Sequence, residues 1–286
     1  MATEAHLKEH RIAVFFDFEN IITGVRDAKY DQFHLELILD RLVEKGKIIF
    51  KRAYCDWSRF REHKNEMHEH SFELVDIPKK RISGKNSADI RMVVDALDLC
   101  YTKAHVDTFV IVSGDSDFSP LVSKLRENDK TVIGIGVKKS TSDLLVSACD
   151  EFIYYDDLVR EQKPRRRKTQ ATPAPATTTS PKRKSPANAP SYAESAEAPP
   201  ADNKLDEALD LIRVTVEALV EERGGDEPVW GSMVKQTLKR RKPGFNERYY
   251  GFGSFNELLE EAGARGQVEL ERDAKSGGYI VRPAAP

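Results

Sequence analysis

The chain has 286 residues, a formal net charge of −2, 40% hydrophobic residues and 32% charged residues, which is the composition of a soluble globular protein of one or two domains. No apolar run approaches the roughly 18 residues of a membrane-spanning helix, and the first ten residues are polar, so neither a membrane span nor a secretory signal is expected. Cys55, Cys100 and Cys149 are scattered without a C-x-x-C pair. This excludes a disulfide frame or a cysteine zinc site and indicates a reducing, cytoplasmic location.

The charge is unevenly distributed. Residues 1–157 carry 23 Lys and Arg against 28 Asp and Glu, whereas residues 158–203 carry 9 against 4. Positive charge therefore collects in the middle of the chain, where it would hold a polyanion.

Apolar segments of strand length alternate with helical patterns from Arg11 to Asp157. The predicted strands are 12–16, 48–54, 72–77, 108–113, 131–137 and 152–155. The predicted helices include a stripe over 35–43, a polar stretch over 58–70, then 87–101, a helix opened by Ser119-Pro120, and 142–148. In the helix over 87–101 we expect Ile90, Val93, Val94 and Leu97 to face inward and Asp95 and Asp98 to be solvated. This alternation predicts an α/β fold, a doubly wound parallel sheet covered on both faces.

Acidic side chains follow two of these strands. Asp17 ends the first strand, and Asp115 and Asp117 follow the fourth. Because sites in such sheets lie at the carboxyl ends of strands, where the strand order reverses, we expect Asp17 and Asp115 to converge. Asp89, at the start of a helix, is the fourth candidate. Grouped carboxylates are ligands for a hard cation such as Mg²⁺, which can activate water and stabilise charge on a phosphodiester.

An alternative for each single Asp is a purely structural one, since Asp after a strand often caps a helix or forms a turn. Other acidic or nucleotide motifs fit poorly. An EF-hand loop from Asp115 would need Gly at Pro120 and Glu at Arg126. The chain has no G-x-x-x-x-G-K-[ST] or G-x-G-x-x-G pattern.

Basic residues lie directly before Asp89 in the chain. These residues, predicted to contact substrate phosphates beside the metal, are Lys79, Lys80, Arg81 and Lys85. A solvated loop is the competing interpretation. Asn20 is predicted to hold a water or a phosphate oxygen, and Ser113 to contact a phosphate, since no His–Asp partnership supports a nucleophilic serine.

Residues 158–203 are rich in Pro, Ala and Thr and nearly lack large apolar side chains, which predicts a disordered linker. Its basic clusters, 165–168 and 182–184, suit RNA contact or nuclear import. Residues 204–283 form a second unit, with helices from Leu205 to Val220, 230–240 and 254–262, then strands over 267–271 and 279–282. Three helices followed by a hairpin predict a small winged helix.

Three motifs give the first domain a family resemblance. Phe15-Phe16-Asp17-Phe18-Glu19-Asn20, Ser87-Ala88-Asp89 and Ser113-Gly114-Asp115-Ser116-Asp117-Phe118 occur in the order found in NYN domains of the LabA/DUF88 type. The resemblance covers about residues 10–157 and implies a PIN-like nuclease fold and metal-dependent endoribonuclease activity. Asp17, Asn20, Asp89, Asp115 and Asp117 match the acidic-site pattern of that family. Ala88 stands where many relatives have Val.

The second unit, about 204–283, resembles a LOTUS (OST-HTH) domain. The matching segments are 229–235, 252–259 and 278–281. The resemblance implies RNA binding or docking of a protein partner, and NYN and LOTUS domains are known together in one chain.

The sequence therefore predicts hydrolysis of RNA, in single-stranded form, by a water activated by Mg²⁺ or Mn²⁺. Asp17, Asp89 and Asp115 are expected to hold the metal, and Asp117 and Asn20 to complete its shell or position water. Two alternatives stay open. The first is a non-catalytic RNA-binding adaptor with a PIN-like fold. The second is a haloacid-dehalogenase-like phosphatase, which needs D-x-D at the first strand where this chain has Asp17-Phe18-Glu19.

Overall fold

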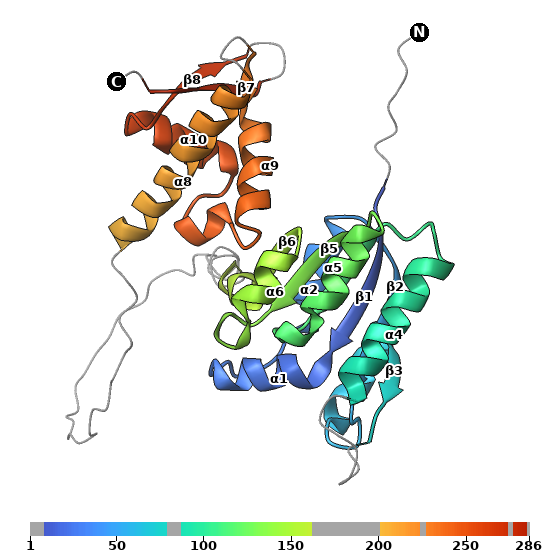
Figure 1. The fold of residues 1–286 in the computed structure, drawn as a ribbon. Helices are drawn as coiled ribbons and strands as arrows, with labels where there is room; N and C mark the ends of the chain where they lie inside the picture. The colour runs from blue at the N-terminus through green and yellow to red at the C-terminus, as the bar shows by residue number, and fades with distance from the viewer. Residues whose placement is uncertain (1–8, 79–86, 162–200, 224–226, 274–276, 285–286) are drawn as a thin grey trace, which may run out of the picture.

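The computed structural model describes residues 9–78, 87–161, 201–223, 227–273 and 277–284. The first domain is built on a six-stranded parallel sheet with helices on both faces (Figure 1). Its strands are β1 (Arg11–Asp17), β2 (Lys47–Cys55), β3 (Glu73–Asp76), β4 (Thr108–Val112), β5 (Thr131–Gly136) and β6 (Glu151–Tyr154). They lie in the order β3-β2-β1-β4-β5-β6. The predicted α/β parallel fold is confirmed, and the strand order reverses between β1 and β4.

The helices of this domain are α1 (Phe18–Asp27), α2 (Leu35–Val43), α3 (Lys64–Glu69), α4 (Ser87–Thr102), α5 (Ser119–Glu127) and α6 (Asp143–Ala148). Short 3₁₀ turns are η1 (Arg61–His63), η2 (Ser116–Phe118) and η3 (Lys138–Ser140). The sequence patterns did not predict α1, although its buried residues Ile21, Ile22 and Val25 have helical spacing. The predicted helix over 58–70 is shorter in the structure, because only η1 and α3 form within it.

Both faces of the sheet are buried, which explains the continuous apolar strands. In β1, Val14 and Phe16 pack into the core on one face, and Ala13 and Phe15 pack into the core on the other. All four of these side chains are fully buried. The carboxyl end of β1 is therefore a firm base for Asp17.

The inward face of α4 differs from the predicted one. Ile90 and Val94 are 62% and 55% exposed, whereas Met92 and Ala96 are fully buried. Val93 and Leu97 are partly buried against the same core. Two apolar stripes run along this helix, and helical spacing alone does not say which of them meets the sheet. Packing against β1 and β2 selects the stripe of Met92 and Ala96.

Asp95 of α4 was predicted to be solvated, and this prediction is wrong. Its side chain is 10% exposed and accepts hydrogen bonds from Arg52 (2.9 Å), Tyr54 (3.0 Å) and Arg91 (3.0 Å). Asp98, three residues on, is exposed as expected. Asp95 therefore ties α4 to β2.

Replacing Asp95 with Ala is expected to lower the free energy of unfolding by about 2 kcal/mol, because the buried Tyr54 hydroxyl would lose its partner and Arg52 would keep only the more exposed Glu73. Urea unfolding followed by circular dichroism measures this. The exposed Asp98→Ala is the matched control and is expected to change stability by less than about 0.5 kcal/mol. Equal losses in the two variants would contradict the structural role of Asp95.

The C-terminal unit contains α8 (Ala201–Glu222), α9 (Gly231–Arg241), α10 (Phe255–Ala264) and a 3₁₀ turn, η4 (Glu247–Tyr250). Its antiparallel sheet has the order β7-β9-β8, from β7 (Val229–Trp230), β8 (Val268–Arg272) and β9 (Tyr279–Pro283). The three helices and the final hairpin lie where the sequence places them. The strand β7 was not predicted; it lies directly before α9 and pairs with β9.

The predicted linker over 158–203 falls mostly on residues 162–200, which lie outside the described residues, as do both of its basic clusters. The prediction is wrong for the first residues of this range, 158–161. Residues 155–161 are helical, and Leu158 is buried in the core of the first domain. The first domain therefore extends beyond Asp157, because Leu158 contributes an apolar side chain to its core. Among the described residues, no helix is both long and apolar enough to cross a membrane.

Candidate active site

Asp17 and Ser113 meet where β1 and β4 end. The two strands pair in parallel up to Phe16 and Val112. The hydroxyl of Ser113, which is fully buried, donates to Oδ2 of Asp17 at 2.9 Å, and Asp17 itself is only 8% exposed. The predicted convergence of the two strand ends is present in the structure because β1 and β4 are neighbours across the reversal of strand order.

Asp17 lies in an unfavourable place for a negative charge. The pKa of Asp17 is raised to about 7, mainly by burial and also by the nearby carboxylates of Asp89 and Asp115, against the opposing effect of hydrogen bonds from Ser113 and the Asn20 backbone. A buried carboxyl facing two other carboxylates takes up either a proton or a cation. Strongly shifted carboxyls of this kind cluster at functional sites.

The side chains of Asp17, Asn20 and Asp89 border one pocket of about 290 Å³. Asp89 enters it from the first turn of α4, while Asp17 and Asn20 enter from the junction of β1 and α1. Asp89 also borders a second groove, between α4, α5 and α6, in which Asp117 lies. Asp89 therefore stands between Asp17 and Asp117.

Asp115 and Asp117 follow β4 in different settings. Oδ1 of Asp115 accepts from the Asp117 backbone N–H at 3.0 Å and caps η2, while the Asp117 side chain is exposed. Asp17 likewise caps α1 by accepting from the Asn20 N–H. Asp17 and Asp115 therefore each cap a helical turn, which is the purely structural role open to an Asp after a strand. An ionised carboxylate has about four acceptor positions, so a cap leaves capacity for a ligand.

Asn20 and Ser113 hold the loop after β4 in place. Oδ1 of Asn20 accepts from the Gly114 N–H at 2.9 Å, and Oγ of Ser113 accepts from the Asp115 N–H at 3.2 Å. Gly114 is packed so closely that a Cβ on it would lie 2.4 Å from the Ser140 carbonyl oxygen. These contacts fix the direction in which Asp115 leaves the sheet.

The oxygen atoms that could bind a metal around this pocket suit a hard cation. They are carboxylate and amide oxygens, the ligands that Mg²⁺ and Mn²⁺ prefer. Cys55 also borders the pocket, but burial raises its pKa, so the sulfur stays a neutral thiol. Within the described residues no three His, Cys, Asp or Glu side chains come close enough together to enclose a metal. The arrangement therefore fits an ion held by one or two carboxylates and several waters, which is the usual mode of Mg²⁺.

Two acids of the pocket were not among the predicted site residues. Asp56, which is 8% exposed, follows β2, and Glu19 lies in the first turn of α1, where it pairs with Arg59. The strand-end rule that selected Asp17 also selects Asp56, because β2 lies beside β1 and ends at the same edge. The predicted phosphate-binding residues Lys79, Lys80, Arg81 and Lys85 lie outside the described residues.

This chain is similar to several known proteins. The family model of the NYN domain matches residues 11–156. An uncharacterized protein of Methanocaldococcus jannaschii is 32% identical over 145 residues, which are 51% of this chain and 55% of that protein, so the match spans about half of the relative's length. A solved structure of a protein of unknown function from Vibrio parahaemolyticus is 25% identical, with a TM-score of 0.47, and covers 55% of this chain and 98% of the other. The match over residues 11–156 shows that the chain belongs to the NYN domain family.

Proposed function

We propose that this NYN protein is a Mg²⁺- or Mn²⁺-dependent endoribonuclease acting on single-stranded RNA. The observation that carries the proposal is the position of Asp17, buried at the strand crossover with Asp89 and Asp115 close enough to raise its pKa. The NYN family includes nucleases. Of the acids that match its site pattern, Asp17 and Asp89 border the pocket, and Asp117 lies in the neighbouring groove. A divalent cation would relieve the repulsion between the carboxylates.

Asp17, Asp89 and Asp115 are the proposed metal site, in which one or two of them would bind the ion directly and the others through its waters, with Asp117 and Asn20 at the edge. When bound, the cation would lower the pKa of a water and stabilise the charge that develops on the phosphodiester. Ser113 and Asn20 keep Asp17 and the Asp115 loop in register through the hydrogen bonds described above. Their proposed role is thus to orient the ligands, in addition to the substrate contacts predicted for them.

A non-catalytic RNA-binding adaptor is the second candidate. It is favoured by the finding that no three acidic, His or Cys side chains of the described residues approach closely enough to enclose a metal. The two candidates differ in turnover and not in RNA affinity, so a cleavage assay separates them.

For the C-terminal unit we propose a LOTUS-type role in holding RNA or a protein partner. Its helices and hairpin, and the basic last turn of α9, support this assignment. Tethering such a binding unit to the nuclease domain would raise the local concentration of RNA at the acidic pocket.

Replacing Asp115 with Asn is expected to reduce Mn²⁺-dependent cleavage of single-stranded RNA by at least about 100-fold, the scale of removing one preorganised group that acts on developing charge. Gel analysis of a labelled RNA under single-turnover conditions measures the rate. The exposed Asp98→Asn, on the far half of α4, is the matched control and should cleave as the wild type does.

Excess EDTA should stop cleavage by the wild type and by Asp98→Asn. Full activity of Asp115→Asn, or of the wild type in EDTA, would overturn the metal-dependent mechanism. RNA binding without cleavage under any divalent metal would establish the adaptor instead.

A further inference from the structure

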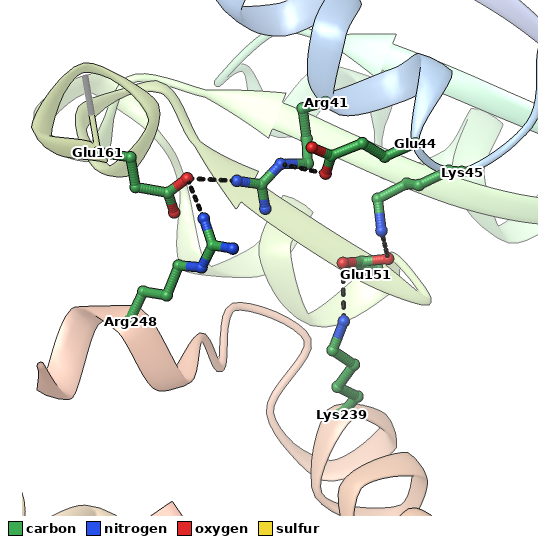
Figure 2. A network of polar contacts seen from close by, with 7 residues as sticks. All are labelled: Arg41, Glu44, Lys45, Glu151, Glu161, Lys239 and Arg248. Atoms are coloured by element: carbon green, nitrogen blue, oxygen red, sulfur yellow. Dashed lines mark hydrogen bonds and ion pairs between the residues drawn. The ribbon is translucent and has the colours of Figure 1, made fainter. Parts of the chain in front are cut away.

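Two carboxylates of the first domain bind cations of the C-terminal unit (Figure 2). Glu151, at the start of β6, accepts from Lys45 of its own domain at 2.7 Å and from Lys239 of α9 at 2.8 Å. Oε2 of Glu161 contacts both Arg41 of its own domain and Arg248 of η4, the latter at 2.7 Å. We call the surface on which the two units make these contacts the docking interface.

The docking interface also covers the free edge of the sheet. The backbone N–H of Phe152 in β6 donates to the carbonyl oxygen of Pro243 at 2.9 Å. Gly244 lies against the ring of Tyr154, where a Cβ would be 3.1 Å from a ring carbon. β6 is the last strand of the sheet, and an unpaired edge of this kind is otherwise available for pairing with other chains.

The interface reaches the turn that borders the acidic pocket. Nζ of Lys138 lies 4.1 Å from the ring centroid of Tyr249, and the guanidinium of Arg160 lies 5.4 Å from the same centroid. Lys138 begins η3, and Ser140, which ends η3, borders the pocket of Asp17. In the docked state Lys138 therefore contacts Tyr249, and Lys138 lies two residues before Ser140 of the pocket wall.

The ion pairs hold Glu151 in its charged form but are weak enough to be screened by salt. Burial of Glu151 opposes its charge, yet Lys45 and Lys239 hold its pKa below the usual value. The side chains of Glu151 and Glu161 are each 23% exposed, and that of Arg248 is 48% exposed. Partly exposed pairs of this kind are individually weak and are screened by salt.

We propose that RNA opens this interface, because its phosphates compete with Glu151 and Glu161 for Lys239 and Arg248. A carboxylate and a phosphate make the same charge-assisted hydrogen bonds with lysine and arginine. Opening frees Lys239 and Arg248 on the C-terminal unit and Lys138 beside the acidic pocket, so that three cations become accessible to one RNA strand. The proposal rests on RNA being the ligand, as in the proposed function.

The docked state is tested on the full chain by small-angle X-ray scattering in EDTA, where no cleavage interferes. Lys239→Glu should increase the radius of gyration at low salt, and adding Glu151→Lys should restore the wild-type value, since the pair is then re-formed with reversed charges. Arg240→Glu is the matched control, because it is the exposed neighbouring residue on α9 with the same charge change, and it should leave the chain docked. A wild-type radius for Lys239→Glu would overturn the interface.

The competition is tested with a short oligouridylate, also in EDTA. The isosteric double variant Glu151→Gln/Glu161→Gln should be open and should bind the oligonucleotide roughly tenfold more tightly than the wild type, since two ion pairs no longer have to be broken. Glu36→Gln/Glu62→Gln removes the same charge from exposed positions and should bind as the wild type does. Equal affinity of the two double variants would overturn the competition.

The two proposals fail in distinguishable ways. If no variant binds the oligonucleotide, RNA is not the displacing ligand and the RNA-binding part of the proposed function fails with it, whereas the scattering still decides whether the units dock. If RNA binds and opens the chain but Mn²⁺ produces no cleavage, the interface proposal holds and the nuclease proposal fails.

Discussion

Replacing Asp17 with Asn is expected to abolish RNA cleavage, by at least about 1000-fold, while leaving the metal-free protein at least as stable as the wild type. The loss follows because Asp17 is the buried carboxylate of the proposed metal site, with Asp89 and Asp115 near enough to raise its pKa. The stability follows because the same burial and the same neighbours destabilise its negative charge. An amide removes that charge and still accepts from the Asn20 N–H and pairs with the Ser113 hydroxyl.

At pH 8 the buried charge of Asp17 destabilises the folded protein by a few kcal/mol, since each unit of pKa shift corresponds to about 1.4 kcal/mol, and the amide removes this cost. Thermal melting in EDTA should therefore give Asp17→Asn a midpoint equal to or above that of the wild type. Added Mn²⁺ should raise the midpoint of the wild type and of the control Asp98→Asn, but not that of Asp17→Asn. A clear destabilisation of Asp17→Asn in EDTA would show that its ionised carboxylate supports the fold, contrary to the electrostatic argument.

The affinity for Mn²⁺ is expected to rise about tenfold per pH unit up to about pH 7 and then to level off. Asp17 has a pKa of about 7 in the folded, metal-free protein, so below that pH a proton must leave before the carboxylate can bind a cation. Isothermal titration with Mn²⁺ at several pH values from about 5.5 to 8.5 measures the affinity and the released proton. Asp17→Asn should bind weakly and without this pH dependence, and a flat affinity in the wild type would contradict the assignment of Asp17 as a ligand.

The same pKa determines how metal-free stability varies with pH. The folded protein holds the Asp17 proton more tightly than the unfolded chain, in which the pKa is near its ordinary value of 3.8. Raising the pH from about 4 to about 7 therefore lowers the free energy of unfolding, and above that range the contribution of Asp17 is constant. Asp17→Asn should lack this decline, which urea unfolding at pH 5 and pH 8 in EDTA would show.

Local patterns were sufficient for the elements of the fold. The apolar runs that became β1 and β4 predict buried parallel strands because both faces of such a sheet are covered. The same patterns place Asp17 and Asp115 at strand ends, because the position of a residue relative to a strand can be read along the sequence. The helix α1 was missed although Ile21, Ile22 and Val25 have helical spacing.

Side-chain direction required contacts between distant segments. On α4 two apolar stripes compete, and only packing against the sheet buries Met92 and exposes Ile90. Asp95 and Asp98 look alike in the sequence, yet Asp95 is held by Arg52 and Tyr54, which lie more than 40 residues earlier. No local pattern contains that pairing.

The parallel α/β fold, the NYN resemblance of residues 10–157 and the acids that end β1 and follow β4 could all be predicted from residue patterns along the chain. The burial of Asp17 near Asp89 and Asp115, with its raised pKa, and the ion pair between Glu151 and Lys239 of the C-terminal unit could be found only in the folded chain. The reason is that strand and helix patterns arise from neighbouring residues, whereas burial and charge pairing depend on which distant segments the fold brings together.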